Sequence, residues 1–340
     1  MRFFRSPPGL WMLGGLLALL ALMFTGVARA QPATAGGTAA GNPVLVGVYV
    51  NKIQDLNFRE NKYVIDFYLW FRWKPEGALA EFKPLDSFEI INGKIEDKGS
   101  IVEKQIGDLN YVSVRVSATM SETWELSRFP FDSHTVRINI EDSALTIPDL
   151  VFMPDRNNSG LGDEIDIAGW NALNFMVDVK DKIYRTNYGD TSLPKDARSD
   201  YSRFVFGVDL ERVSFGSAIK LLSTVLLATA VAFVAFFVKP SDLDARFGMG
   251  VGSLFAVAAS AFISASLVPD SGEMTVSDKL HMVALGFIFL TLLISALGLK
   301  LEVTGREELA FKLDRYCLVL MPLAFFGWAA FEVWRSLRAS

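Results

Sequence analysis

The sequence predicts an extracellular all-β sandwich, antiparallel and immunoglobulin-like, followed by a four-helix transmembrane domain. Two observations lead to this fold class. Between residues 43 and 213, short apolar or alternating runs are separated by turn signals, a pattern typical of sandwich strands. From residue 214 the composition changes abruptly, and four apolar segments follow that are each long enough to cross a bilayer as a helix.

The N-terminal segment predicts export from the cytoplasm. Residues 1–30 combine a basic start, an apolar run at 10–24 and an A-x-A cleavage signal at 28–30, which together are typical of a secretory signal peptide. The alternative is a first transmembrane anchor. Residues 31–42 are rich in Ala, Gly and Thr, so we expect a flexible leader before the sandwich.

The predicted strands rest on side-chain alternation. In the clearest run, Tyr68, Trp70 and Arg72 point to one side and the intervening residues to the other. Turn signals such as Asn92-Gly93 separate the runs. We expect strands near 44–50, 63–73, 111–120, 135–140, 171–180 and 201–211.

The predicted helices carry an orientation signal in their connections. The loop at 269–278 holds three acidic residues and no basic one, whereas basic residues gather in the other two connections. By the positive-inside rule, the sandwich and the acidic loop then lie outside the cytoplasm. We expect the helices near 214–238, 243–268, 279–300 and 312–334.

Composition excludes several classes of function. The net charge of −5 argues against a nucleic-acid partner. One cysteine, Cys317, and two histidines, His134 and His281, leave little from which to build a zinc site or a Cys/His nucleophile pair. We therefore expect no catalytic residues, no metal, no cofactor and no enzyme activity.

The second apolar segment is unusual for a helix that faces lipid. It is dominated by Ala, Gly and Ser, and it carries Asp244 and Arg246 at one end. Helices that carry small, polar and charged side chains through a membrane face protein or water. The segment is interpreted as a pore-lining helix, with a buried helix of a monomeric bundle as the alternative. The pore-facing stripe is Asp244, Gly248, Gly252, Phe255, Ala259, Phe262 and Ser266.

A short motif connects the two predicted domains with a known family. Phe-Pro-Phe-Asp at 129–132, followed by alternation at 135–140, resembles the signature of the pentameric ligand-gated ion channels, the Cys-loop receptor superfamily. The chain resembles the bacterial form, because Glu122 and Val136 stand where animal members have their cysteine pair. Matching positions elsewhere are Trp73, Arg212, Arg246, Val268, Pro269, Arg315 and Pro322.

The resemblance implies an assembly and a location. Five identical subunits would form a homopentameric receptor channel in a lipid bilayer, gated by a small-molecule or ionic agonist, or by protons, bound between subunits. The membrane would be the bacterial inner membrane, with the N-terminal domain in the periplasm. The alternative is a membrane-tethered periplasmic sensor that has no conducting pore.

The resemblance also assigns candidate residues to two sites. Residues expected to couple the sandwich to the helices are Asp55, Phe131, Asp132, Arg212 and Pro269. Candidate agonist-binding residues are Tyr68, Glu141, Asp142, Trp170, Tyr188 and Tyr201. Ile91 and Ser143 stand where two aromatic residues of the family's amine-binding site are expected, so a cage for a quaternary amine is incomplete here.

The sequence supports two interpretations of the charge of the permeating ion. A ring of Asp244 carboxylates at the inner mouth attracts cations, which favours a cation channel. The segment at 245–250 instead resembles the family's anion channels, although Arg246 lies off the pore stripe. An anion-selective channel of the same fold is therefore the competing interpretation.

Overall fold

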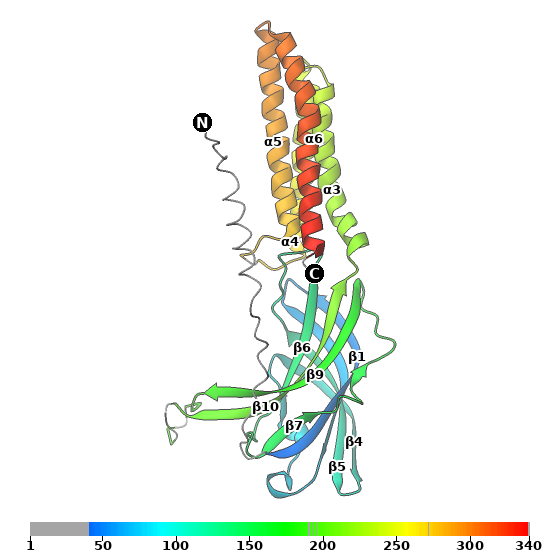
Figure 1. Cartoon of the computed structure of the whole chain (residues 1–340), viewed down its shortest axis with the longest axis vertical. Coiled ribbons are helices and arrows are strands. Elements are labelled where there is room, and N and C mark those ends of the chain that lie inside the picture. The colour runs from blue at the N-terminus through cyan, green and yellow to red at the C-terminus, as the bar shows by residue number, and fades with distance from the viewer. Residues whose placement is uncertain (1–40, 190, 193, 195, 271, 339–340) are drawn as a thin grey trace, which may run out of the picture. The chain divides into compact units, whose positions relative to one another are not determined.

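The computed structural model describes residues 41–338 except 190, 193, 195 and 271. Strands occupy the chain from Asn42 to Arg212 and long helices occupy it from Ser214 to Arg338, so the predicted fold class is confirmed (Figure 1). The predicted signal peptide at 1–30, and all but the last two residues of the predicted leader, lie outside the described residues.

Two sheets form the sandwich. The larger sheet has the order β4-β5-β2-β1-β7, and β8 pairs with β1 beyond that path. The smaller sheet has the order β3-β6-β10-β9. The strands of the larger sheet are β1 (Asn42–Asn57), β2 (Lys62–Trp73), β4 (Gly93–Ile106), β5 (Leu109–Ser121), β7 (Leu150–Pro154) and β8 (Gly160–Leu161). Those of the smaller sheet are β3 (Phe88–Ile90), β6 (Ser133–Asp142), β9 (Trp170–Arg185) and β10 (Arg198–Arg212).

The sandwich core is built by the period-two pattern of its strands. Every second residue of β2, from Tyr63 to Trp73, is buried between the sheets. Phe67 of β2 meets Phe206 of β10 edge-on with ring centroids 5.1 Å apart, which joins the two sheets.

The structure departs from the predicted sandwich in two respects. Strands β3, β4, β7 and β8 were not predicted: nearly all side chains of β4 are exposed and its sequence lacks apolar alternation, and the other three strands are five residues or shorter. The sandwich is also not purely antiparallel, since β7 and β8 run parallel to β1. After β6 the chain crosses between the sheets, and Leu150 enters the larger sheet beside Asn42, at the end where β1 begins.

Four helices follow, and each is long and apolar enough to cross a membrane. Helices α5 and α6 extend at both ends beyond the apolar segments 279–300 and 312–334 that predicted them, whereas α3 with its 3₁₀ turn and α4 begin at the predicted residues and end slightly earlier than predicted. Helix α5 begins after Thr275, which forms a capping box with Asp278. The helices are α3 (Ser214–Val234, continued by the 3₁₀ turn η3, Ala235–Phe237), α4 (Leu243–Ser266), α5 (Val276–Val303) and α6 (Glu307–Arg338).

Polar side chains join α4 to α5 inside the helical domain. The His281 ring on α5 contacts the Ser260 hydroxyl of α4 through Nε2 at 2.9 Å, and its Nδ1 lies 2.7 Å from the Ser277 carbonyl oxygen. Ser264 and Ser277 are hydrogen-bonded at 2.7 Å. Each of these four side chains is buried. One face of α4 is therefore held against α5 by hydrogen bonds as well as by apolar packing.

A buried ion pair fixes the end of α4 that is remote from the sandwich. Arg246 is fully buried. Its Nη1 donates to Asp314 Oδ1 of α6 at 3.1 Å, its Nη2 contacts the other carboxylate oxygen, and its Nε donates to the Val238 carbonyl at 3.1 Å. The guanidinium thus ties α4 to α6 and to the end of η3.

Removing the Asp314 carboxylate should destabilise the helical domain strongly. Asp314→Ala leaves the Arg246 guanidinium buried without its counter-charge, at an expected cost of about 3–5 kcal/mol. Thermal unfolding in detergent measures this as a lower midpoint. The double variant Arg246→Met/Asp314→Leu removes both charges, and we expect it to recover most of the loss. An unchanged midpoint for Asp314→Ala would contradict the assignment.

Candidate functional site

The Phe-Pro-Phe-Asp motif lies between the two hydrophobic cores of the molecule. Phe129 is buried in the sandwich core, whereas Phe131 is buried among the helices. The Phe129 carbonyl also accepts a hydrogen bond from the backbone N–H of Ser277, in the first turn of α5, at 3.2 Å. The motif therefore packs against both domains at once.

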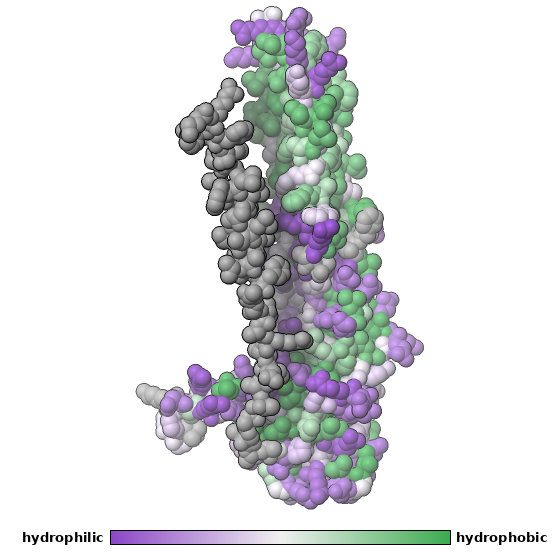
Figure 2. Space-filling model, in the orientation of Figure 1, coloured by the Kyte–Doolittle hydropathy of each residue, from purple (hydrophilic) through white to green (hydrophobic). Residues whose placement is uncertain are grey.

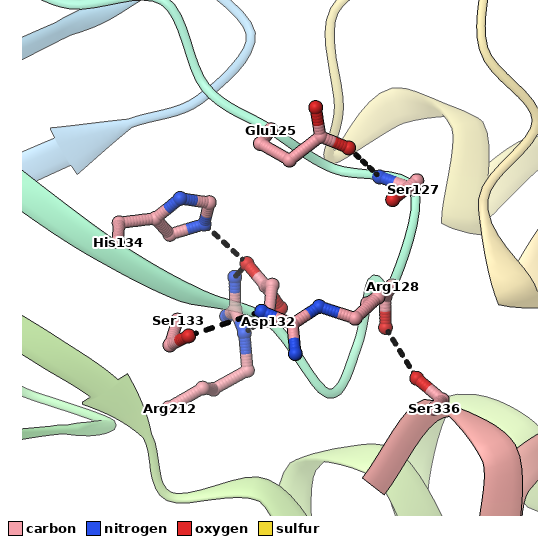
Figure 3. Close-up of polar contacts among 8 residues, drawn as sticks. All are labelled: Glu125, Ser127, Arg128, Asp132, Ser133, His134, Arg212 and Ser336. Atoms are coloured by element: carbon pink, nitrogen blue, oxygen red, sulfur yellow. Dashed lines mark hydrogen bonds and ion pairs between the residues drawn. The ribbon is translucent and has the colours of Figure 1, made fainter. Parts of the chain in front are cut away.

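Asp132 and Arg212 form a two-point ion pair at this junction (Figure 3). Arg212 Nε donates to Asp132 Oδ1 at 2.8 Å, and Nη2 donates to Oδ2 at 3.0 Å. His134 Nε2 contacts Oδ2 at 2.6 Å. Arg212 is the last residue of β10, and Val213 alone separates it from the start of α3. The ion pair therefore anchors the point where the sandwich passes into the first helix.

This environment keeps Asp132 ionised. Burial on its own raises the pKa of the carboxyl group, but hydrogen bonds from His134 and Arg212 and the positive charge of Arg212 outweigh it. The pKa of Asp132 is lowered to about 2. The ion pair is therefore intact across the physiological pH range.

Aromatic rings surround the Arg212 guanidinium. Its central carbon lies 4.2 Å from the ring centroid of Trp170, 5.1 Å from that of Phe58 and 5.2 Å from that of Phe129. Sequence reasoning missed Phe58 and His134 at this site. Both are isolated apolar or aromatic residues in the sequence, and only the register of the folded strands brings them to Arg212.

The structure places Trp170 apart from two other candidate agonist residues, and its role in agonist binding stays a prediction. Trp170 was a candidate for agonist binding, together with Tyr188 and Tyr201. In the structure Trp170 begins β9 and lies opposite Arg212, whereas Tyr201 lies opposite Lys182 near the other end of the strand. Trp170 is buried in the domain junction and away from the tyrosines.

The other predicted coupling residues lie around the same junction. Asp55 is exposed, with a backbone φ of 53°, and lines a cavity of about 1210 Å³ together with Arg212, Ser266 and Leu267. Val268 is buried in the sandwich core, and Pro269 follows it. The junction therefore joins the end of α4 to β1 and β10.

The predicted pore stripe is the exposed face of α4. Its two rings, Phe255 and Phe262, are 74% and 78% exposed. Every member of the stripe is exposed in the single chain: Asp244, Gly248, Gly252, Phe255, Ala259, Phe262 and Ser266. The buried face consists of Arg246, Gly250, Ser253, Val257, Ser260 and Ser264. Among the described residues, the two phenylalanine rings of this face form no ring contact and remain largely exposed.

A second polar cluster lies on the smaller sheet. Glu141 is buried at the end of β6 and pairs with Arg203 of β10. Tyr184 of β9 donates to Glu141 Oε2 at 3.1 Å and accepts from Arg203 Nη2 at 2.9 Å. Burial, and then the charge of Glu141, raise the pKa of Tyr184. Sequence reasoning missed Arg203 and Tyr184, because single residues of alternating strands carry no motif.

Two of the predicted tyrosines join this cluster. The Tyr201 ring meets Tyr184 edge-on at 5.7 Å, and Tyr188 lies 6.4 Å from Tyr184 in the β9–β10 connection. Tyr188 is 68% exposed. Tyr68 lies in β2 of the other sheet, opposite Tyr49 and Arg115. The single chain thus brings Tyr188 and Tyr201 to Glu141, and Tyr68 belongs to the other sheet.

The Asp142 carboxylate is held by hydrogen bonds from its own chain. Its Oδ1 accepts hydrogen bonds from the backbone N–H groups of Ala144 and Leu145 at 3.0 and 2.8 Å, and its Oδ2 accepts one from the Ser87 hydroxyl. The carboxylate is buried, and these three donors tie the end of β6 to the turn after it. Asp142 therefore stabilises this turn, and its role in agonist binding stays a prediction.

A sandwich joined by a buried Asp–Arg pair to four membrane helices is the architecture of pentameric ligand-gated ion channels. No family model matches the chain. Curated relatives do: the gamma-aminobutyric acid receptor subunit theta of Mus musculus is 20% identical over 274 residues, which is 74% of this chain and 41% of that protein. The proton-gated ion channel of Gloeobacter violaceus is 20% identical over 307 residues, 84% of this chain and 81% of that one.

These relatives confirm the resemblance to the pentameric channel superfamily. By name they are a receptor subunit and an ion channel, and neither is an enzyme. The chain spans less than half the length of the mouse subunit, and most of the length of the bacterial channel.

The Asp132 ion pair should lose its stabilising effect only in strong acid. The folded pKa of about 2 lies below the value of about 3.9 for an unfolded aspartate. The stabilisation, about 2 kcal/mol, is thus complete above about pH 4 and is lost as pH falls toward 2. We expect the gap in melting temperature between the wild type and Asp132→Asn to be constant from pH 8 to about pH 5 and to shrink below pH 4.

The exposed substitution Glu307→Gln serves as the control, and we expect it to leave the melting temperature unchanged at every pH. A gap that instead changes between pH 5 and 8 would contradict this account of the carboxylate.

Proposed function

We propose that the chain is the subunit of a homopentameric, cation-selective, ligand-gated ion channel whose pore is lined by α4. The exposed stripe of α4 is the observation that carries the proposal. A membrane helix with one face packed on its own chain, and two phenylalanine rings and a carboxylate on the other, needs a water-filled space or further subunits on that face. Five copies around an axis supply both.

The positions of the two phenylalanines are suited to a hydrophobic gate in the pore. Phe255 and Phe262 lie seven residues apart, or about 10 Å along the helix, on the same face. Around a five-fold axis each becomes a ring of aromatic side chains. Narrow hydrophobic rings stop ions by dewetting, so the stripe supports a closed state without a separate plug.

The charges at the inner end of α4 favour cations. Asp244 is exposed on the stripe, whereas Arg246 is buried and neutralised by Asp314. The one basic residue of the segment that resembles anion channels therefore faces protein, and the carboxylate remains free to line the inner mouth. The sign of the field at the mouth is then negative.

The positions of the tyrosines support an agonist site between subunits. Tyr184, Tyr188 and Tyr201 gather beside Glu141 and Arg203 on one sheet, and Tyr68 lies on the other sheet. Two neighbouring copies would bring these sheets together at a shared boundary. The pocket would present aromatic rings and a hydrogen-bonded Glu–Arg pair, which suits a small polar or charged agonist, an ion or a proton.

The location follows from the helices and the predicted N-terminal signal. Four membrane-spanning helices make the chain a multi-pass membrane protein. With the sandwich in the periplasm of a bacterium, α3 runs inward and α6 returns outward, and the basic connections face the cytoplasm. The second candidate function is a periplasmic sensor with no pore. In that case the stripe of α4 would pack against protein in the assembly, and no water would lie along it.

Recording from Phe255→Ala channels tests conduction and selectivity without knowledge of the agonist. Removing the ring should leave the pore leaky, because a wider, less apolar constriction stays wet. In planar bilayers with a salt gradient, we expect the reversal potential to lie near that of the cation. Adding Asp244→Asn should move it toward zero, whereas Glu307→Gln, at the same end but off the stripe, should leave it unchanged.

The possible results separate the candidates. A reversal potential near that of the anion would support the anion-selective alternative. Purified pentamers without conductance in the Phe255→Ala variant would support the tethered sensor.

Breaking the junction should separate assembly from opening. Arg212→Gln removes the partner of a buried carboxylate. We expect correctly assembled pentamers whose maximal current is reduced at least about tenfold. Arg198→Gln in the same strand is the matched control, because its pair with Asp200 lies at the surface and should matter little. Wild-type currents from surface-expressed Arg212→Gln would contradict the coupling role.

A further inference from the structure

A chain of hydrogen bonds connects the Phe-Pro-Phe-Asp motif with α4. The backbone N–H of Ser277, in the first turn of α5, donates to the Phe129 carbonyl oxygen at 3.2 Å. The Ser277 hydroxyl lies 2.7 Å from that of Ser264 on α4. The Ser277 carbonyl oxygen lies 2.7 Å from His281 Nδ1, and His281 Nε2 lies 2.9 Å from the Ser260 hydroxyl of α4. Polar contacts therefore run without a break from the domain junction to the buried face of α4.

The partners of the His281 ring determine the role of each nitrogen. A carbonyl oxygen only accepts hydrogen bonds, so Nδ1 carries a proton and donates it to Ser277. A second proton, on Nε2, would place a charge in a buried site where, among the described residues, the polar contacts of the ring are with serines alone. Nε2 therefore accepts from the Ser260 hydroxyl. The ring bridges its own helix and α4.

The two serines of α4 differ from three other buried hydroxyls in the helices. Thr229, Thr291 and Ser295 each donate to the carbonyl oxygen four residues earlier in their own helix, at 2.7, 3.0 and 2.9 Å. Such a local bond satisfies the hydroxyl without joining two helices. The hydroxyls of Ser260 and Ser264 are bonded to α5 instead. The contact between α4 and α5 is therefore specified by polar groups at this level.

The surroundings of this network strengthen its hydrogen bonds. The helices have a mainly hydrophobic surface away from their ends (Figure 2). Ser260, Ser264, Ser277 and His281 are each 6% exposed or less. Hydrogen bonds are stronger in a site of low dielectric constant, and water does not take the place of a partner that is lost there. The bridge through His281 is therefore suited to holding α4 in one orientation.

The bond from Ser260 can also be released at a small cost. If α4 turned away from α5, the Ser260 hydroxyl would find the carbonyl oxygen of Ala256, four residues earlier, as Ser295 does within α5. The donor on α4 would then stay satisfied. The ion pair of Arg246 and Asp314 at the other end of α4 has no such substitute, because separating it would leave buried charges unpaired. The helix thus has one fixed end and one releasable contact.

We propose that His281 is a positioning residue that latches the pore helix. The latch consists of the hydrogen bonds from Ser260 to His281 and from His281 to Ser277, and it sets the rotation of α4 about its own axis. That rotation directs Phe255 and Phe262 away from the packed face. Because Ser277 also bonds the motif at the junction, the latch joins the orientation of the pore helix to the position of that loop. The inference rests on the proposed function in taking α4 as the pore helix.

Two substitutions of His281 separate the bridge from simple packing. The amide oxygen of glutamine reaches the position of Nε2, so His281→Gln keeps an acceptor for Ser260. Asparagine is shorter, so His281→Asn keeps only the donor to Ser277. Ser260→Ala removes the other side of the bridge. Ser295→Ala is the matched control, because it removes a buried hydroxyl of α5 that bonds within its own helix.

Thiol labelling of the assembled protein in lipid nanodiscs measures the rotation of α4. In a Cys317→Ser background, Val257→Cys places a reporter on the buried face, three residues before Ser260. We expect a charged, water-soluble reagent to label this reporter at least about fivefold faster in His281→Asn and in Ser260→Ala, the scale of losing one hydrogen bond. Combining the two substitutions should add nothing, since they break the same bond. His281→Gln and the Ser295→Ala control should label at the wild-type rate.

Two results would overturn the latch. One is wild-type labelling of the Val257 reporter in Ser260→Ala, which is a mild substitution in a helix and keeps the test valid if His281→Asn folds poorly. The other is equally fast labelling in His281→Gln or Ser295→Ala, which would indicate a general loosening of the helices.

A second reporter, Gly252→Cys on the open face of α4, distinguishes failure of the latch from failure of the proposed function. If this reporter is labelled while the Val257 reporter is unchanged in all variants, only the latch is contradicted. If it stays unlabelled in the wild type and in every variant, the pore is contradicted, and the latch with it.

Discussion

The ion pair between Asp132 and Arg212 is the interaction on which the rest of the structure depends. It joins the loop that enters both hydrophobic cores to the last residue of the sandwich before α3. Aromatic rings lie against the guanidinium, and His134 contacts the same carboxylate oxygen, Oδ2, as Arg212 Nη2. Removal of either partner would leave an uncompensated buried charge. The pair therefore fixes the end of β10 next to the first helix.

Helix α4 divides the helical domain into a packed side and an open side. Its buried face is held by the His281 and Ser264 hydrogen bonds in the half nearer the sandwich and by Arg246 at the end remote from the sandwich. Its open face carries small side chains, two phenylalanines and Asp244, with Val251 and Ile263 also exposed beside them. The polar residues that made the segment a poor lipid-facing helix thus have two separate explanations. Those on the buried face join α4 to its own chain, and those on the open face are the candidates for a functional role.

Sequence alone could predict the architecture because it depends on local patterns. The length of the apolar segments predicted the four helices, and side-chain alternation predicted strands such as β2. Helical periodicity also found the exposed face of α4. The patterns failed where a residue acts through a distant partner. Asp314, Arg203 and Phe58 have no local signature, and only strand register reveals that Trp170 lies opposite Arg212.

Chemical labelling of α4 tests most directly whether its open face meets water in the assembled protein. Cys317 is the only cysteine, so a Cys317→Ser background allows single cysteines along α4. In lipid nanodiscs, a charged, water-soluble thiol reagent should label cysteines at Gly252, Phe255 and Ala259, since thiolates form only in water. Cysteines at Val257 and Ser260 should stay unlabelled. Equal labelling of both faces, or none on the open face, would contradict a water-filled pore lined by this helix.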